Sequence, residues 1–200
     1  MPLRSVLVTV PSGRFTESTM PAPSKRARIL EAAARIVEID GAAHLTIDAV
    51  AAAAGVSKGG VLYHFPTKLA LLEGMLERLL EQIAERAESW RESGAGEPNG
   101  ALIARIQEEH EQQPSERAMA RAILAAAAEN PDLLAGARAQ VEQAFAEAAA
   151  GSRPAEVGWT LLLAVEGLRF LDMLKLLPLS PQDRERVHTH LLSLAREHGR

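Results

Sequence analysis

The sequence predicts an all-α protein of about nine helices. Ala, Leu, Glu and Arg dominate its 200 residues, and aromatic residues make up only 4%, a mixture that favours helix over strand. From residue 24 onward, apolar residues recur three and four positions apart, which is the spacing of one face of a helix. That region contains neither a strand-like alternation nor an internal repeat. With 47% hydrophobic and 24% charged residues, the chain has the composition of an ordinary soluble globular protein.

Three short helices are predicted at residues 25–39, 47–54 and 58 to about 65. Each begins directly after a residue whose side chain can cap a helix N-terminus, and the first two are followed by a glycine that can end them. In order along the chain, these capping and terminating residues are Ser24, Asp40-Gly41, Thr46, Gly55 and Ser57.

A long fourth helix is predicted from Pro66-Thr67 to near Arg91, with leucines along one face. Residues 94–100 are rich in Gly, Pro and Asn and form the clearest loop in the chain. Asn130-Pro131 is a strong helix start, with Asn as the cap and Pro in the first turn. The remaining helices are predicted at 101–112, 115–129, 131–150 and 155–177, with a last one beginning at residue 180.

Several classes of protein are excluded by what the sequence lacks. Without cysteine it can form no disulfide, thiol nucleophile or cysteine-based metal site, and it suits a reducing compartment. It also has no metalloprotease, phosphate-loop, dinucleotide or nucleophile-elbow motif. His188 and His190 lie roughly 200° apart around a helix, so they do not easily share an ion. We therefore expect no enzyme, no cofactor and no metal.

The charge distribution divides the chain into a mildly basic head and an acidic body. Residues 24–68 carry a net charge of +2 and residues 69–200 a net charge of −7. The longest apolar stretch, 157–177, is interrupted by four charged residues, so we expect no membrane span and a cytoplasmic protein. Residues 1–23 show few structural signals, and we expect a disordered extension, with Met20 as the native start.

Residues 46–65 have the pattern of a helix-turn-helix, in which the second helix enters the DNA major groove. Ser57 and Lys58 begin that second helix, and Gly59 and Gly60 remove side-chain bulk, so the backbone can come close to DNA. Tyr63 and His64 offer donors to phosphates, and Lys68 offers a cation. Lys25, Arg26 and Arg28 can reach the DNA backbone or an adjacent minor groove. The geometry also occurs in proteins that bind no DNA, and Tyr63 is as compatible with a half-buried position as with a DNA contact.

Residues 25–72 resemble the DNA-binding domain of the TetR family of transcriptional regulators. The resemblance lies in Arg28-Ile29-Leu30-Glu31-Ala32-Ala33, in Leu45 to Ala51, in Gly55 to Phe65 and in Lys68-Leu69-Ala70-Leu71-Leu72. It implies that Thr46, Tyr63, His64 and Lys68 hold phosphates. It also implies that Ser57, Lys58, Gly59 and Gly60 face bases. Position 60 usually carries Ala, Ser or Thr, so Gly60 offers fewer base contacts than usual.

The same resemblance implies a DNA-binding domain at 24–68 and a helical effector-binding and dimerisation domain at 69–200. We expect a homodimer that binds a pseudo-palindromic operator in double-stranded DNA and is released by an unidentified small-molecule effector. The alternative is an effector-independent or architectural DNA-binding protein of the same fold. Operator, effector, regulated genes and the choice between repression and activation are not readable from the sequence.

The helix at 155–177 is apolar nearly all round, so it needs both a core and a second subunit to cover it. The dimer candidates are Leu161, Leu168, Val187, Leu191 and Leu194, unless these residues only complete a monomeric core. Glu166 and Arg169 form either an exposed ion-pair ladder or groups that face a cavity or the interface. The main effector candidates are His110, Met119, Phe145, Trp159, Glu166, Arg169 and Phe170.

Overall fold

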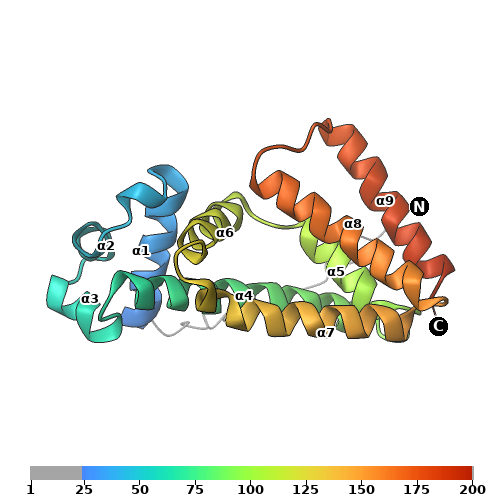
Figure 1. Ribbon diagram of the computed structural model, residues 1–200, viewed down its shortest axis with the longest axis horizontal. Coiled ribbons are helices and arrows are strands. Elements are labelled where there is room, and N and C mark those ends of the chain that lie inside the picture. Colours follow the sequence, from blue (N-terminus) through green and yellow to red (C-terminus); the bar gives the residue numbers. More distant parts are fainter. Residues whose placement is uncertain (1–23, 200) are drawn as a thin grey trace, which may run out of the picture.

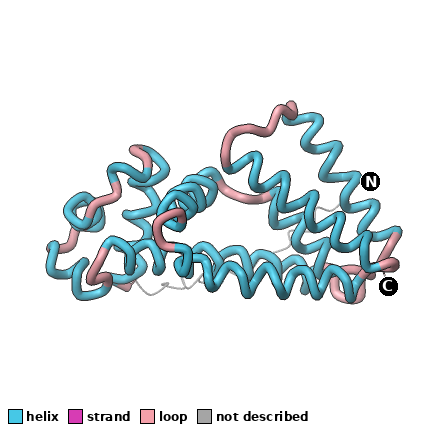
Figure 2. The backbone as a smooth tube through the Cα atoms, in the orientation of Figure 1, coloured by secondary structure: helices cyan, strands magenta, loops and turns pink. Residues whose placement is uncertain are grey.

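The computed structural model describes residues 24–199, and this part of the chain is helical with no strand (Figures 1 and 2). The prediction of an all-α fold is confirmed. Nine α-helices and two short 3-10 helices, η1 and η2, make up the described residues. In chain order they are α1 Lys25–Ile39, η1 Ala42–His44, α2 Ile47–Ala54, α3 Lys58–His64, α4 Lys68–Ser93, α5 Gly100–His110, α6 Pro114–Ala127, η2 Pro131–Leu134, α7 Ala135–Gly151, α8 Ala155–Met173 and α9 Pro181–Glu197.

The predicted caps of the first three helices are confirmed. The hydroxyls of Ser24, Thr46 and Ser57 each accept a hydrogen bond from the backbone N–H three residues later. Gly55 ends α2 with a φ of 65°, in the left-handed region that glycine adopts without strain. The expected extension at residues 1–23, including Met20, lies outside the described residues.

Two predicted helices end or begin elsewhere than the sequence pattern indicated. The predicted helix at 131–150 is split into η2 and α7, because Asn130 makes no side-chain capping bond and the first turn closes as a 3-10 helix. The predicted helix at 155–177 stops at Met173. Lys175 takes a φ of 59°, a left-handed conformation that ends the helix although the residues beyond it are still apolar.

The molecule is elongated, with α1, α2 and α3 at one end and α9 toward the other (Figure 1). Helix α4 starts beside α3 and runs along most of the length. Helix α6 packs against both α1 and α4, while α5, α7, α8 and α9 pack together in the other half. In the described part of the chain, no helix is both long and apolar enough to cross a membrane.

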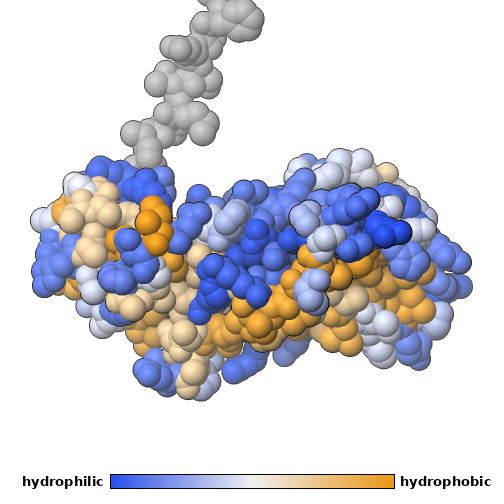
Figure 3. Space-filling view, turned by 90° about the horizontal axis from the view of Figure 1, so that it is seen from above, coloured by the Kyte–Doolittle hydropathy of each residue, from blue (hydrophilic) through white to orange (hydrophobic). Residues whose placement is uncertain are grey.

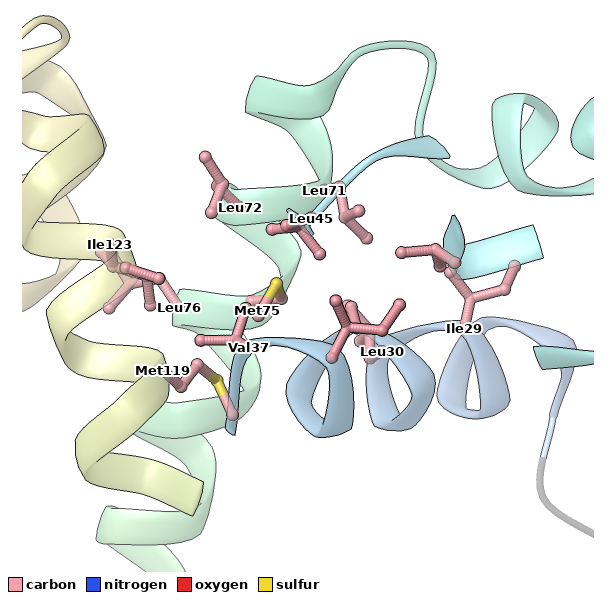
Figure 4. Close-up of a cluster of buried hydrophobic side chains, with 14 of the residues drawn as sticks. Ile29, Leu30, Val37, Leu45, Leu71, Leu72, Met75, Leu76, Met119 and Ile123 are labelled. Atoms are coloured by element: carbon pink, nitrogen blue, oxygen red, sulfur yellow. The ribbon is translucent and has the colours of Figure 1, made fainter. Parts of the chain in front are cut away.

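A first hydrophobic core joins the head to the body. It contains residues of α1, α2, α3, α4, α6 and η2 (Figure 4). Phe65, predicted to be a core residue, is 3% exposed, and Gly74 of α4 makes room for it, since a Cβ there would lie 2.6 Å from the Phe65 ring. A second core lies between α5, α7, α8 and α9. The head therefore shares its core with α4 and α6, so a shift of either helix changes its support.

Candidate nucleic-acid interface

The helix-turn-helix is built from α2, a tight turn and α3. Its turn is fixed by Gly55 and by Arg28 of α1, whose Nη2 donates to the Ala54 carbonyl at 2.7 Å. Arg28 was predicted to reach DNA. Its side chain is exposed, and one of its N–H groups is used to satisfy the end of α2, so the contact with DNA stays a prediction. Ser57 Oγ accepts from Gly60 N at 3.0 Å and so orients the first turn of α3.

The side chains predicted to contact DNA lie on the surface of the head. Tyr63 is 83% exposed, which removes the half-buried alternative, and its ring meets His64 edge-on at 5.1 Å between centroids. Lys58 is exposed and pairs with Asp48 of α2 at 3.0 Å. Gly59 faces open space, since a Cβ built there would meet nothing within 4 Å. Packing therefore gives no reason for a glycine at position 59.

Four further predicted contacts lie on α1 and at the starts of α2 and α4. Thr46 caps α2 at the surface, and Lys68 opens α4 directly after the turn that follows α3. Lys25 is exposed at the start of α1. Arg26 is also exposed, but it already bonds to Glu77 at 2.8 Å and lies 5.4 Å from the centre of the Phe65 ring. Since Arg26 has an intramolecular partner, it must exchange that partner to meet a phosphate.

A cavity of about 410 Å³ lies in the body between α4, α5, α7 and α8. Its floor is apolar and includes Ile83, Leu102 and Leu162. Polar groups line its walls, where Arg91 joins Glu88 at 3.1 Å and Glu147 at 2.9 Å. The remaining lining residues are Ala84, Glu85, Ala87, Ala101, Arg105, Gln140, Gln143, Ala144 and Ala148.

None of the seven effector candidates taken from the sequence lines this cavity. Met119 is 5% exposed and lies in the first core, near Val37 of α1 and Leu76 of α4 (Figure 4). Trp159 and Phe170 are exposed on α8, and Phe145 packs against the second core. The cavity residues were missed because most are alanines, glutamines and charged residues, which carry no hydrophobic signal in the sequence.

Glu166 and Arg169 pair with each other at 3.7 Å and belong to a partly buried ionic network rather than to an exposed ladder. Arg105 Nη2 donates to Glu166 at 2.7 Å, and Arg169 bonds to Glu108, which is fully buried. Glu108 also accepts from Arg86 of α4 at 3.0 Å. Arg86 in turn reaches Glu116 of α6 at 2.6 Å. The network therefore runs from Arg105 at the cavity wall to α6, the helix that packs on the head.

Burial and pairing shift the pKa values of these groups in opposite directions. Burial raises the pKa of Glu166, but the guanidinium groups of Arg169 and Arg105 outweigh it, so the net pKa is lower than usual. Burial alone would lower the pKa of Arg169, yet Glu108 and Glu166 raise it further, and the net pKa is above its ordinary value. Glu166 and Arg169 are thus both kept ionised by their partners.

A second ionic group ties α5, α6, α8 and α9 together. Arg184 of α9 bonds to Glu109 at 2.9 Å and to Asp172 at 2.8 Å. Asp172 also pairs with Arg117 of α6 at 3.0 Å. Burial raises the pKa of Glu109, and the charges of Arg184 and Arg169 oppose that rise only in part.

The residues predicted for a dimer interface point mainly into the second core. Leu161 and Leu191 are buried there, and Leu168, Val187 and Leu194 pack partly buried against it. Helix α8 instead exposes a different set of apolar side chains, of which Leu163 is 58% exposed. We call the residues Trp159, Leu163 and Phe170 the α8 stripe. In Figure 3 a hydrophobic band runs along the half of the molecule that contains α8 and α9.

A helix-turn-helix at one end of an all-helical chain defines a class of DNA-binding transcriptional regulators. Residues 29–75 match the model for bacterial regulatory proteins of the tetR family, and residues 99–196 match the model for the tetracyclin repressor-like C-terminal domain. The chain belongs to the TetR family of transcriptional regulators.

Curated relatives match in the DNA-binding segment. The HTH-type transcriptional regulator CymR of Pseudomonas putida is 45% identical over 60 residues, which are 30% of this chain and 30% of CymR. The nucleoid occlusion factor SlmA of Aliivibrio fischeri is 38% identical over 65 residues, 32% of this chain and 33% of SlmA. The chain thus matches about a third of the length of these relatives.

Solved structures match over most of the chain. The multidrug binding protein EbrR, complexed with imidazole, is 26% identical with a TM-score of 0.62, covering 84% of this chain and 95% of EbrR. A TetR-family member from Streptomyces coelicolor is 27% identical with a TM-score of 0.65, covering 84% of this chain and 98% of that one. A TetR transcription regulator from Haloarcula marismortui, with a TM-score of 0.71 over 88% of this chain and 98% of its own, is 20% identical and shows the fold alone.

Proposed function

We propose that this regulator is a dimeric repressor that leaves its operator when a small molecule occupies the cavity between α4, α5, α7 and α8. The observation that carries the proposal is the exposed leading face of α3, which the capped turn at Gly55 to Ser57 presents at the end of the molecule. Effector-independent or architectural DNA binding is the alternative. It would be favoured if no ligand of the cavity weakened DNA binding.

The DNA contacts divide by chemistry. Lys58 and the backbone at Gly59 and Gly60 would meet base edges together with Ser57. Arginine and lysine read guanine most often, so Lys58 would release Asp48 when it binds a base. Phosphates would be held by the second group, Thr46, Tyr63, His64, Lys68, Lys25 and Arg26.

Two copies are needed because one short helix offers few base contacts, and two heads on a pseudo-palindrome double them. The α8 stripe supports a second copy as the partner, since an exposed helix face of this kind marks an interaction site. Gly167 lies beside the stripe, and a Cβ built on it would meet nothing within 4 Å. A helix of a second copy could therefore approach this position closely.

The dimer is tested by placing a charge in the stripe. Leu163→Glu should convert the dimer to a monomer in sedimentation equilibrium, because a carboxylate in an apolar interface loses its hydration. Ile39→Glu is the matched control, since Ile39 is 77% exposed on the head. A monomeric parent protein, or an unchanged Leu163→Glu dimer, would defeat this part of the proposal.

The route from cavity to head is supported by two connections. Helix α4 carries Lys68 at one end and the cavity residues Ile83 to Arg91 near the other, so the two sites lie on one rod about 39 Å long. The ionic network joins Arg105 at the cavity wall to Glu116 of α6, which packs on α1. An effector that prefers one position of α4 would change the spacing of two heads.

The cavity favours a small, mostly apolar molecule with a polar or cationic group. Apolar residues form its floor, and Glu85, Glu88 and Glu147 stand against Arg91 and Arg105 in its walls. EbrR, which has a similar fold, is described in complexes with imidazole, malachite green and ethidium. We therefore choose malachite green as the first probe.

The test compares dye binding by two alanine variants of α7. Ala144→Phe fills the cavity and should abolish the change in dye absorbance, whereas Ala146→Phe, on the exposed side of α7, should bind as the parent does. The dye should also release operator DNA from the parent. Equal binding by both variants would place the site elsewhere, and absence of binding by the parent would exclude this class of cation.

A further inference from the structure

Two histidines and a glutamate converge where the end of α5 meets α9. His110 is the last residue of α5, and Glu185 and His188 lie one turn apart on α9. His110 Nε2 is 3.2 Å from Glu185 Oε2, and His188 Nδ1 is 3.9 Å from Glu185 Oε1. The two imidazoles stack with their centroids 4.0 Å apart and their planes at 17°. His110 thus has a partner 78 positions away, which no local pattern could indicate.

Each imidazole keeps a buried nitrogen without a hydrogen-bond partner. These atoms are Nδ1 of His110 and Nε2 of His188. The His188 side chain belongs to a residue that is only 8% exposed, so solvent is largely kept from it. The two unpaired nitrogens are not the ones that face Glu185, so the atoms available to an ion beside that carboxylate are Nε2 of His110 and Nδ1 of His188.

We propose that His110, Glu185 and His188 form a binding site for one divalent transition-metal ion, with Zn²⁺ as the best fit. Two imidazoles and one carboxylate are a ligand set of known zinc sites in which water takes the fourth position. The set contains no thiolate, which makes soft copper(I) a poor match. The site lies outside the head and the cavity, so the inference goes beyond the proposed function and does not depend on it.

The ligand atoms are close enough to close on an ion with local movement. One ligand atom from each residue lies within 4.8 Å of the others. Tetrahedral zinc with bonds near 2.0–2.1 Å holds its ligands about 3.4 Å apart, so the atoms must draw in by roughly an ångström. The lone pairs lie in the ring planes, so one stacked ring must also tilt toward the ion.

The surroundings permit a cation and give it a route of entry. Two arginines flank Glu185 on α9. Arg184 is held by Glu109 at 2.9 Å and Asp172 at 2.8 Å, and Arg186 pairs with Asp183 at 3.5 Å, so both charges have partners. The Glu185 side chain is 60% exposed and links the site to solvent. A bound ion would fasten α9 to α5, two helices that enclose the second core.

The experiment uses full-length protein free of any histidine tag and stripped of metal by a chelator. Zn²⁺ is titrated by calorimetry and Co²⁺ by visible absorption, on the parent and on His110→Gln, His188→Gln and Glu185→Gln. His190→Gln is the matched control, because His190 lies exposed on the same helix two residues away. Thermal melting with and without Zn²⁺ provides a second readout.

We expect one ion per chain in the parent and in His190→Gln, with a higher Tm when Zn²⁺ is present. Each histidine variant should weaken binding at least about tenfold and lose the rise in Tm. Glu185→Gln, at an exposed position where folding is not at risk, should weaken binding in the same way. The proposal is overturned if the parent binds no ion, or if the three variants bind like His190→Gln.

Discussion

At the scale of single residues, helix α3 differs from an ordinary helix because two residues in its first turn, Gly59 and Gly60, have no side chain. Gly59 has open space where its Cβ would be, and Gly60 would place a Cβ 3.3 Å from Ser57 Oγ. Glycine costs roughly 1 kcal/mol relative to alanine inside a helix, so the pair weakens α3. In the proposed function this cost is offset by close approach of the backbone to DNA.

The variant Gly59→Ala separates these effects. It should leave the free energy of unfolding unchanged or raise it by up to about 1 kcal/mol, because alanine favours helix and meets no neighbour. Binding to operator DNA should nevertheless weaken, as measured by fluorescence anisotropy. Stronger or unchanged DNA binding would show that the glycine is not needed for approach to the bases.

The lowered pKa of Glu166 makes a prediction about acid stability. A carboxyl whose pKa is lower in the folded state contributes stability above its unfolded pKa and loses that contribution as the pH falls through its folded pKa. Glu166→Gln should therefore reduce the free energy of unfolding near neutral pH, by roughly 1.5–3 kcal/mol for bonds to charged groups. The gap between variant and parent should close in acid. Urea unfolding across a pH series would check it, and a gap that is constant with pH would contradict it.

At the scale of helices, the prediction from sequence succeeded where caps and periodicity agree. Ser24, Thr46 and Ser57 each cap the helix that they were expected to start. It failed where the local backbone decides where a helix starts, as at Asn130, or where it ends, as at Lys175. Apolar residues continue past Lys175, so the hydrophobic pattern contained no sign of the left-handed turn.

The crossing of α7 and α8 depends on one small residue. A Cβ on Gly158 would lie 2.1 Å from the backbone oxygen of Ala148, which cannot rotate away. Gly158→Ala should thus force the helices apart and destabilise the protein by about 1–3 kcal/mol, despite the better helix propensity of alanine. Gly100→Ala is the control, since a Cβ at the start of α5 would meet nothing within 4 Å. Equal melting temperatures for the two variants would refute a close crossing.

At the scale of the molecule, the sequence predicted the parts better than their connections. The surface of the head could be predicted because its residues are adjacent in a recognisable motif. The cavity and the ionic networks could not, because they join residues far apart in the chain, such as Arg105 with Glu166 and Arg86 with Glu116. The apolar character of α8 was visible in the sequence. Apolar periodicity alone did not distinguish the face of this helix that packs in the core from the face that carries the exposed α8 stripe.

The central claim is that α3 and the residues around it bind DNA. The most direct measurement is binding of the purified protein to its own upstream DNA at several salt concentrations. The double variant Tyr63→Ala with Lys68→Ala is compared with Lys175→Ala, which removes an exposed cation on the body. We predict that two subunits bind each site and that binding weakens as salt rises. The double variant should lose at least about tenfold in affinity for the DNA, while Lys175→Ala should bind as the parent does. Binding that the double variant retains in full, or no specific site even in a random DNA pool, would contradict the account.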